Sequence, residues 1–170
     1  METWDVYNKN REKLNKTIIR NEKLDEGEYH ISVHIWIVND NNEFLIQKRS
    51  ANKKRSPNMW AMTGGAVLTG EKGVEACVRE IKEELDISVK TSDLIFIGTI
   101  NRPKSFVDIY LLKDNTKIDN MNMQEDEVAE VKWVSISEID NLIAEEKFAS
   151  SILDGYKMCL EYISKNQEEF

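Results

Sequence analysis

One amphipathic segment, residues 71–85, limits the folds open to this chain more than any other feature of its sequence. Its apolar residues recur at helical spacing and form a single stripe: Val74, Cys77, Val78, Ile81 and Leu85. A helix with one apolar stripe has to pack that stripe against another layer. Strand-like segments lie on both sides of this helix, so the pattern predicts an α/β fold and not a bundle or a repeat.

Short β-branched and aromatic runs predict the strands. The expected strands are residues 30–38, 44–47, 60–62, 94–99, 107–112 and 128–134. The first two are joined by a turn at residues 39–42 and form a hairpin. A final helix is expected at residues 148–165, and a shorter one before it has either Ser135 or Ser137 as its cap. We therefore expect a layered α/β sandwich with a mixed sheet.

The first 28 residues differ from the rest because they are mostly polar. We expect them to form a hairpin or a loosely docked arm. Residues 29–170 then make up the main domain, and a chain of 170 residues suits one such domain.

Composition excludes several classes of function. The chain carries 23 Lys and Arg against 31 Asp and Glu, a formal net charge of −8, whereas duplex nucleic acid is bound by basic surfaces. No apolar run reaches the roughly 18 residues that cross a bilayer, and the first ten residues lack a signal-peptide layout. The 2 cysteines are too few for a disulfide framework. We expect a cytoplasmic protein that binds neither a membrane nor duplex nucleic acid.

The predicted helix also carries an acidic cluster. Glu80, Glu83 and Glu84 stand at positions i, i+3 and i+4, so their carboxylates share one face beside the apolar stripe. Like charges at this spacing repel one another, and a cation removes the repulsion. Oxygen ligands without a neighbouring histidine or thiolate favour Mg²⁺ or Mn²⁺. Taken alone, the cluster is more typical of a solvated acidic face than of a metal site.

The surrounding residues match the signature of the Nudix hydrolases, G-x5-E-x7-R-E-U-x-E-E-x-G-U, where U is aliphatic. The residues in register are Gly65, Glu71, Arg79, Glu80, Ile81, Glu83, Glu84 and Ile87. The resemblance extends over roughly residues 30–140, with residues 44–49 similar to the strand before the signature. It departs at Asp86, which replaces the second glycine. Asp tolerates the left-handed conformation expected at a helix end better than most residues.

The resemblance implies a Nudix-type α/β/α sandwich with a catalytic loop-helix-loop, and metal-dependent cleavage of a diphosphate linkage. Glu80 and Glu84 would be the main metal ligands, and Glu83 a ligand or the base that activates water. Arg79 would orient these carboxylates by pairing with Glu71. The implied partner is a small-molecule diphosphate with Mg²⁺, or Mn²⁺, as cofactor, and a homodimer is left open.

A further carboxylate in this family often comes from a downstream loop. Glu127 has the best spacing for that role, Glu125 is second, and Asp108 lies on a strand from which it could face the metal. For each of them an ordinary surface acid is the competing interpretation.

Residues expected to meet the substrate lie before the helix. Gly64 and Gly65 would let the backbone turn tightly. The basic residues of positions 48–55 are Lys48, Arg49, Lys53, Lys54 and Arg55. Arg49 is expected to contact a phosphate and Arg55 to attract a polyanion, whereas Lys53 and Lys54 are expected to be solvated.

For two histidines and a tryptophan on the first strand of the main domain we favour structural roles over functional ones. His30 and His34 face the same side and could bind metal, but packed positions are favoured. For Trp36 we expect a place in the core instead of a stacking role.

Two other functions compete with hydrolysis. Residues 29–60 also resemble isopentenyl-diphosphate isomerases, a non-hydrolytic branch of the same fold. That branch needs a cysteine shortly after the tryptophan, and this chain has Ala61 and Met62 after Trp60. The other alternative is a non-catalytic nucleotide-binding sensor, which degenerate signature carboxylates would have favoured.

Overall fold

A computed structural model describes residues 1–166 and is built on a mixed sheet. Along the sheet the strands follow the order β5 (Trp60–Ala61), β4 (Phe44–Arg49), β3 (His30–Val38), β8 (Ser105–Lys113) and β7 (Leu94–Arg102). The β3–β8 pair is parallel, and the remaining pairs are antiparallel. The expected α/β fold with a mixed sheet is confirmed.

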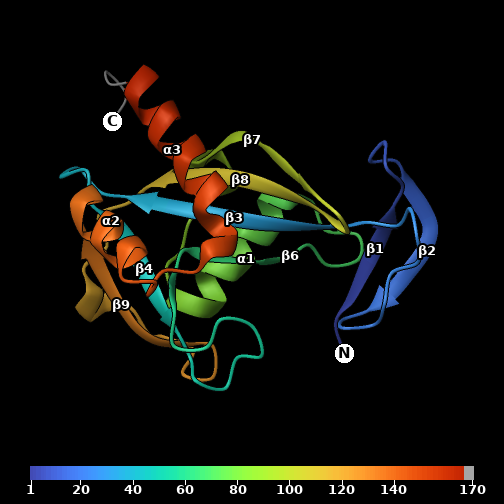
Figure 1. The fold of residues 1–170 in the computed structure, drawn as a ribbon, viewed down its shortest axis with the longest axis horizontal. Helices are drawn as coiled ribbons and strands as arrows, with labels where there is room; N and C mark the ends of the chain where they lie inside the picture. The colour runs from blue at the N-terminus through green and yellow to red at the C-terminus, as the bar shows by residue number, and fades with distance from the viewer. Residues whose placement is uncertain (167–170) are drawn as a thin grey trace.

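The sheet divides along one edge of β3. At its end β3 pairs with β4 through Ile37 and Val38, whereas residues 32–35 pair with β6 (Thr63–Ala66). β9 (Val128–Val134) then extends the β4 branch. The helix α1 (Gly73–Leu85) follows β6 and packs beside β6 and β3, which places it at this division (Figure 1).

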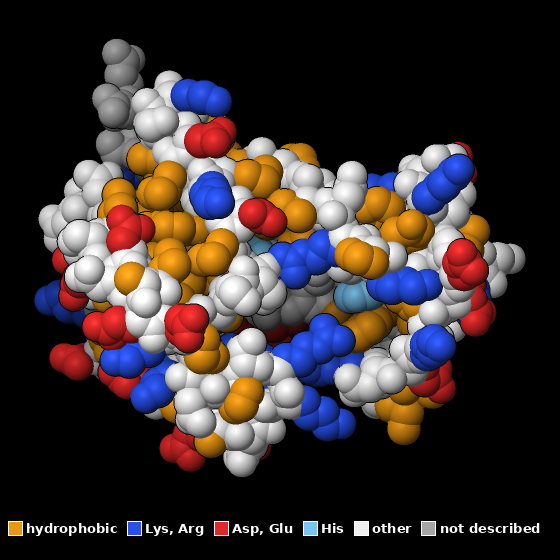
Figure 2. Space-filling model, viewed as in Figure 1, with side chains coloured by type: hydrophobic (Ala, Val, Ile, Leu, Met, Phe, Trp, Pro, Cys, Tyr) orange, Lys and Arg blue, Asp and Glu red, His pale blue; other side chains and the backbone are white. Residues whose placement is uncertain are grey.

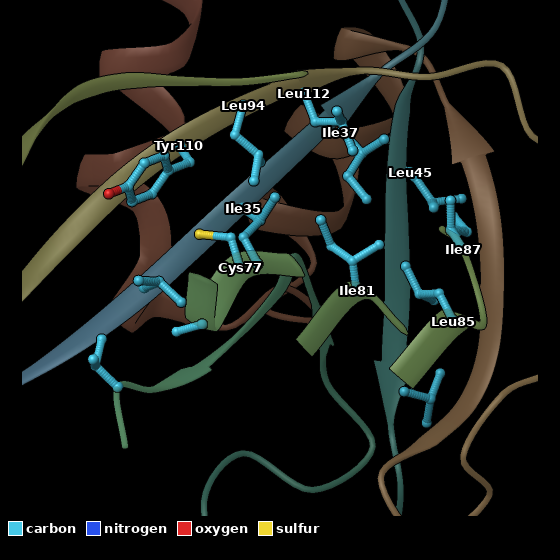
Figure 3. Close-up of a cluster of buried hydrophobic side chains, with 14 of the residues drawn as sticks. Ile35, Ile37, Leu45, Cys77, Ile81, Leu85, Ile87, Leu94, Tyr110 and Leu112 are labelled. Carbon is cyan, nitrogen blue, oxygen red and sulfur yellow. The ribbon is translucent and has the colours of Figure 1, made fainter. Parts of the chain in front are cut away.

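The two faces of β3 bury different cores because successive side chains point to opposite sides. Ile35 and Ile37 pack with Cys77, Ile81 and Leu85 of α1, as Figure 3 shows. The opposite face is covered by α2 (Ile136–Ala144) and α3 (Leu153–Lys165), where a second core holds Trp36, Phe44, Ile139 and Tyr156. The core position expected for Trp36 is confirmed, and its side chain is fully buried.

The helix ends show which boundaries predicted from the sequence are confirmed and which are wrong. At the start of α1 the Glu75 carboxylate accepts a hydrogen bond from the Lys72 backbone, so the helix begins at Gly73 and not at residue 71. It ends at Asp86, whose φ of 58° is the expected left-handed conformation. Ser135 caps α2. The last helix is shorter than expected because a 3₁₀ turn, Ser150–Ile152, precedes it.

The first residues form a hairpin of two strands, β1 (Thr3–Tyr7) and β2 (Lys13–Ile19), which is a separate sheet at one end of the molecule (Figure 1). Val6 and Ile18 pack with Leu24 in a small core of their own. None of the helices in residues 1–166 has the length and apolar character that crossing a bilayer requires.

Candidate functional site

A small cavity of about 100 Å³ lies where α1 meets β6. Its walls carry the carboxylates of the acidic cluster on α1, which are those of Glu80, Glu83 and Glu84. Residues 64–66 of β6 also line the cavity. The segment before β9 adds Gln124 and Glu127. The structure therefore brings together side chains more than 40 residues apart in the sequence.

The two glycines of β6 are required for close approach. A Cβ atom on Gly65 would lie 2.0 Å from Oε1 of Glu80, and one on Gly64 would lie 2.3 Å from the carbonyl oxygen of Val33. Both residues belong to an extended strand, so the expected tight turn at these positions is wrong. The turn before the helix is at Gly70, where φ is 78°. What the signature glycine provides is room for the Glu80 carboxylate.

Arg79 ties the loop before α1 to the acidic cluster. Its Nε and Nη2 atoms each donate to Glu71 at 2.9 Å, as the pairing predicted from the sequence requires, and Nη2 also donates to the carbonyl of Ala66 at 2.9 Å. Nη1 donates to Glu80 at 2.7 Å and to Glu83 at 3.2 Å. One guanidinium therefore fixes the orientation of the loop and of two cluster carboxylates.

Glu84 is the most buried carboxylate of the cluster. Its Oε2 accepts a hydrogen bond of 2.9 Å from Gln47 on β4, whose own Oε1 accepts one of 3.2 Å from Thr63. Burial, together with the negative charge of Glu80, raises the pKa of Glu84 to about 7. Burial also raises the pKa of Glu80. Two carboxylates are thus held where their ionised forms are disfavoured, and a cation would relieve this.

The carboxylate oxygens of Glu80, Glu83 and Glu84 are the type of ligand that a hard divalent cation prefers. Gly65 leaves the space in which the Glu80 carboxylate lies. Within residues 1–166, however, no three acidic, histidine or cysteine side chains converge at coordinating positions. Glu80 and Glu83 are instead turned toward Arg79. Binding a cation in this cavity therefore requires these two carboxylates to exchange contacts.

The loop that follows β4, residues 50–59, contributes Lys53 to the cavity, whereas Arg49 and Arg55 were the residues expected to meet the substrate. Lys53 lines the cavity with only 16 % of its side chain exposed and forms an ion pair with Glu127, so the expectation of a solvated Lys53 is wrong. The loop folds back because the Ser50 amide donates to the carbonyl of Glu127 at 2.9 Å. Lys54 is exposed, as expected.

Arg49 is the last residue of β4 and Arg55 lies in the loop that follows it, and neither is among the described residues that line the cavity. The Nε of Arg49 donates to the carbonyl of Arg55 at 3.1 Å, which directs its guanidinium within the loop. Burial lowers the pKa of Arg49. Figure 2 shows a hollow near the middle of one face, with Lys and Arg side chains around it and acidic side chains within.

Three other candidates are not among the described residues that line the cavity. Asp108 forms an ion pair with Arg11 and accepts 2.7 Å from the Thr99 hydroxyl, so the suggestion that it faces a metal is wrong. His30 stacks on Trp4 with ring centroids 4.5 Å apart. His34 shares its strand face with His30, as expected, and its Nδ1 is buried.

Four residues that line the cavity are not among those expected from the sequence, and they are Glu2, Arg20, Ala66 and Gln124. Glu2 and Arg20 flank the first hairpin and both reach the cavity. The sequence signal for Glu2 and Arg20 is their position, because each lies one residue beyond Thr3 and Ile19, which pair at the open end of the hairpin.

Comparison with known proteins agrees with this geometry. The family model of the NUDIX domain matches residues 28–155. The Listeria innocua protein named uncharacterized Nudix hydrolase lin0387 is 36 % identical over 149 residues, which are 87 % of this chain and 88 % of that protein. Nucleoside triphosphatase NudI of Salmonella agona is 30 % identical over 114 residues, 61 % of this chain and 80 % of that protein.

Among solved structures, DR0079 from Deinococcus radiodurans superposes with a TM-score of 0.76 at 23 % identity, covering 89 % of this chain and 94 % of that one. This likeness concerns the fold alone. The match of the family model and the identity to curated relatives concern the sequence as well. The chain therefore belongs to the Nudix hydrolase family, whose enzymes act on pyrophosphate bonds of phosphorus-containing compounds.

Proposed function

We propose that this protein is a metal-dependent hydrolase that cleaves the diphosphate linkage of a nucleoside diphosphate derivative or a related small organic diphosphate. The observation that carries the proposal is the meeting of three signature carboxylates with two cationic side chains, Lys53 and Arg20, in one cavity. Phosphoryl transfer needs bound cations, a positioned water and little covalent chemistry. The name of the NudI relative supports a substrate derived from a nucleotide.

The proposed cofactor is Mg²⁺, with Mn²⁺ as the alternative, and its proposed ligands are Glu80, Glu83 and Glu84. When bound, such a cation neutralises charge on the phosphates and makes a water more acidic. Arg79 positions the carboxylates, because its hydrogen bonds to Glu71 hold the guanidinium between the loop and the helix.

The proton of the attacking water goes to a carboxylate in this proposal. Glu83 is the first candidate because 52 % of its side chain is exposed and water reaches it, and Glu127 is the second. The β6 backbone at Gly64 and Gly65 borders the space assigned to the substrate.

Arg49 and Arg55 would contact parts of the substrate that extend beyond the cavity, because Arg49 ends β4 and is hydrogen-bonded to Arg55 in the loop that adjoins the cavity. This assigns them to the portion of the substrate that differs between diphosphates.

The test is a panel of nucleoside diphosphates and triphosphates, sugar nucleotides and dinucleoside polyphosphates, with released phosphate measured in Mg²⁺. Glu83→Gln and Glu84→Gln should each lower kcat by about 100-fold or more, because either change removes a ligand charge. Circular dichroism should show both variants folded. Near-normal turnover in both would contradict the assignment of the metal ligands.

Glu75→Gln is the matched control on the same helix. Its carboxylate accepts from the Lys72 backbone at 2.9 Å outside the cavity, and Gln preserves this cap. Its turnover should equal that of the wild type.

The isomerase alternative lacks a thiol at the site. Cys77 and Cys159 are buried, burial raises the pKa of each thiol, and neither is among the described residues lining the cavity. Conversion of isopentenyl diphosphate to its isomer by the purified protein would revive this alternative. Nucleotide binding without hydrolysis of any panel member would favour the sensor.

A further inference from the structure

The hairpin of β1 and β2 delivers two charged side chains to the cavity. Thr3 pairs with Ile19 at the open end of the hairpin, and the next residues outward are Glu2 and Arg20. The Arg20 amide donates to the Glu2 carbonyl at 3.0 Å, and Arg20 Nη1 donates to Glu2 Oε2 at 2.8 Å. Both residues line the cavity together with the carboxylates of α1.

The hairpin is docked onto the loop that carries the first half of the signature. The amide of Thr69 donates to the Thr3 carbonyl at 2.9 Å, and the two threonine hydroxyls are 2.9 Å apart. The amide of Gly70 donates to Asp5 at 2.8 Å. Arg79 of α1 donates hydrogen bonds to the same loop, at Ala66 and Glu71. This loop therefore positions the hairpin relative to the acidic cluster.

A second anchor lies at the far end of the hairpin. Arg11 forms an ion pair with buried Asp108 of β8 and lies 5.6 Å from the centroid of the Phe106 ring. With contacts at both ends, the open end of the hairpin is held against the cavity.

The charges of the cavity give Arg20 a specific chemical role. Acidic side chains predominate among the lining residues, and the cations among them are Arg20 and Lys53. Lys53 is engaged by Glu127. The Arg20 side chain is 46 % exposed, and its guanidinium presents donors beyond the Nη1 that Glu2 engages. A guanidinium of this kind matches the geometry of a phosphate, to which it donates two parallel hydrogen bonds.

We propose that Arg20 binds a phosphate of the diphosphate substrate, and that Glu2 competes with that phosphate for the guanidinium. The inference deepens the proposed function and rests on it. The hairpin is then part of the catalytic site, and its open end determines how tightly the phosphates are held.

The two partners of the Arg20–Glu2 pair should respond in opposite directions. Arg20→Gln removes the phosphate ligand and should raise KM by about 10- to 100-fold with a smaller change in kcat. Glu2→Gln frees the guanidinium and removes a negative charge near the substrate, so KM should fall by about 2- to 5-fold. If the Arg20–Glu2 ion pair only stabilised the fold, the two variants would change KM in the same direction, or neither variant would change it.

Lys16→Gln is the matched control. Lys16 lies on the same hairpin, is 42 % exposed and forms ion pairs with Asp25 and Glu28 away from the cavity. Its KM should be that of the wild type. Thermal unfolding of all three variants separates effects on binding from loss of fold.

Direct binding of imidodiphosphate, measured by calorimetry with and without Mg²⁺, separates this inference from the proposed hydrolysis. Weaker binding by Arg20→Gln and tighter binding by Glu2→Gln support the inference even if the wild type hydrolyses no panel member. Hydrolysis by the wild type with unchanged binding in both variants overturns the inference alone. A wild type that neither hydrolyses nor binds overturns both.

Discussion

At the scale of single residues, the burial of Glu84 in the site lowers the stability of the folded protein when its carboxylate is ionised. Its pKa of about 7 in the folded protein lies above the usual 4.5 of a glutamate, so folding disfavours the ionised form. The resulting penalty is absent well below pH 4.5, grows as the pH rises and is complete above about pH 7. Ionisation of Glu84 thus costs stability under the conditions in which a cation would need it charged.

Glu84→Gln should therefore stabilise the cation-free protein at pH 8 by about 1–3 kcal/mol, because the amide is neutral and still accepts from Gln47. Urea unfolding in a chelator at pH 8 and pH 5 measures this. The gain should shrink at pH 5. A gain that is larger at pH 5 than at pH 8 would contradict the stated sign.

Gly64 and Gly65 give a second residue-scale prediction, since they are adjacent and differ in what a methyl group would meet. In Gly65→Ala the new Cβ meets the movable end of the Glu80 side chain, so turnover should fall about 10-fold or more with little loss of stability. In Gly64→Ala it meets the Val33 carbonyl of the backbone, so unfolding free energy should fall by about 1–3 kcal/mol. Turnover and urea unfolding are measured for both variants. Equal losses of unfolding free energy in the two variants would contradict the prediction.

At the scale of elements, the end of α1 is set by Asp86 in a conformation that glycine adopts more freely. Asp86→Gly should stabilise the protein by about 0.5–1 kcal/mol, because the exposed ion pair it loses with Lys82 contributes little. Asp86→Ala should destabilise it, because a methyl side chain tolerates a φ of 58° poorly. Thermal unfolding ranks the three proteins, and an Ala variant more stable than the Gly variant would contradict the prediction.

The elements also show which parts of the structure the sequence can predict. Helical spacing predicted α1, and the signature predicted the Arg79–Glu71 pair, because both are encoded within 15 residues. The Glu84–Gln47 bond joins residues 37 apart, and the partner on β4 follows from strand pairing that local patterns do not contain. Lys53 was misjudged for the same reason, since its burial depends on a contact with Glu127.

The hairpin is the clearest case of this limit. Its strands follow from local sequence, but its docking depends on contacts of Thr3 with Thr69 and of Arg11 with Asp108. Such contacts span more than 60 positions and have no periodic signature. Glu2 and Arg20 therefore entered the site only through the structure.

At the scale of the whole molecule, the acidic residues behind the net charge of −8 lie partly on the outer surface and partly in the site. Part of the acidic excess lines the cavity, where ion pairs with Arg79, Lys53 and Arg20 compensate only some of it. A divalent cation bound there would complete the compensation, and this links occupancy of the site to global stability by mass action.

Saturating Mg²⁺ should therefore raise the thermal midpoint of the wild type. A concentration 100 times the dissociation constant adds about 2.7 kcal/mol, which for a chain of this size corresponds to roughly 5–10 °C. The measurement is a thermal scan at pH 8 in a chelator and in increasing Mg²⁺. The double variant Glu80→Gln/Glu84→Gln should show no shift, because it removes two ligand charges and leaves the rest of the acidic surface intact. An equal shift in both proteins would mean that the cation acts on the surface charge and not on this cavity.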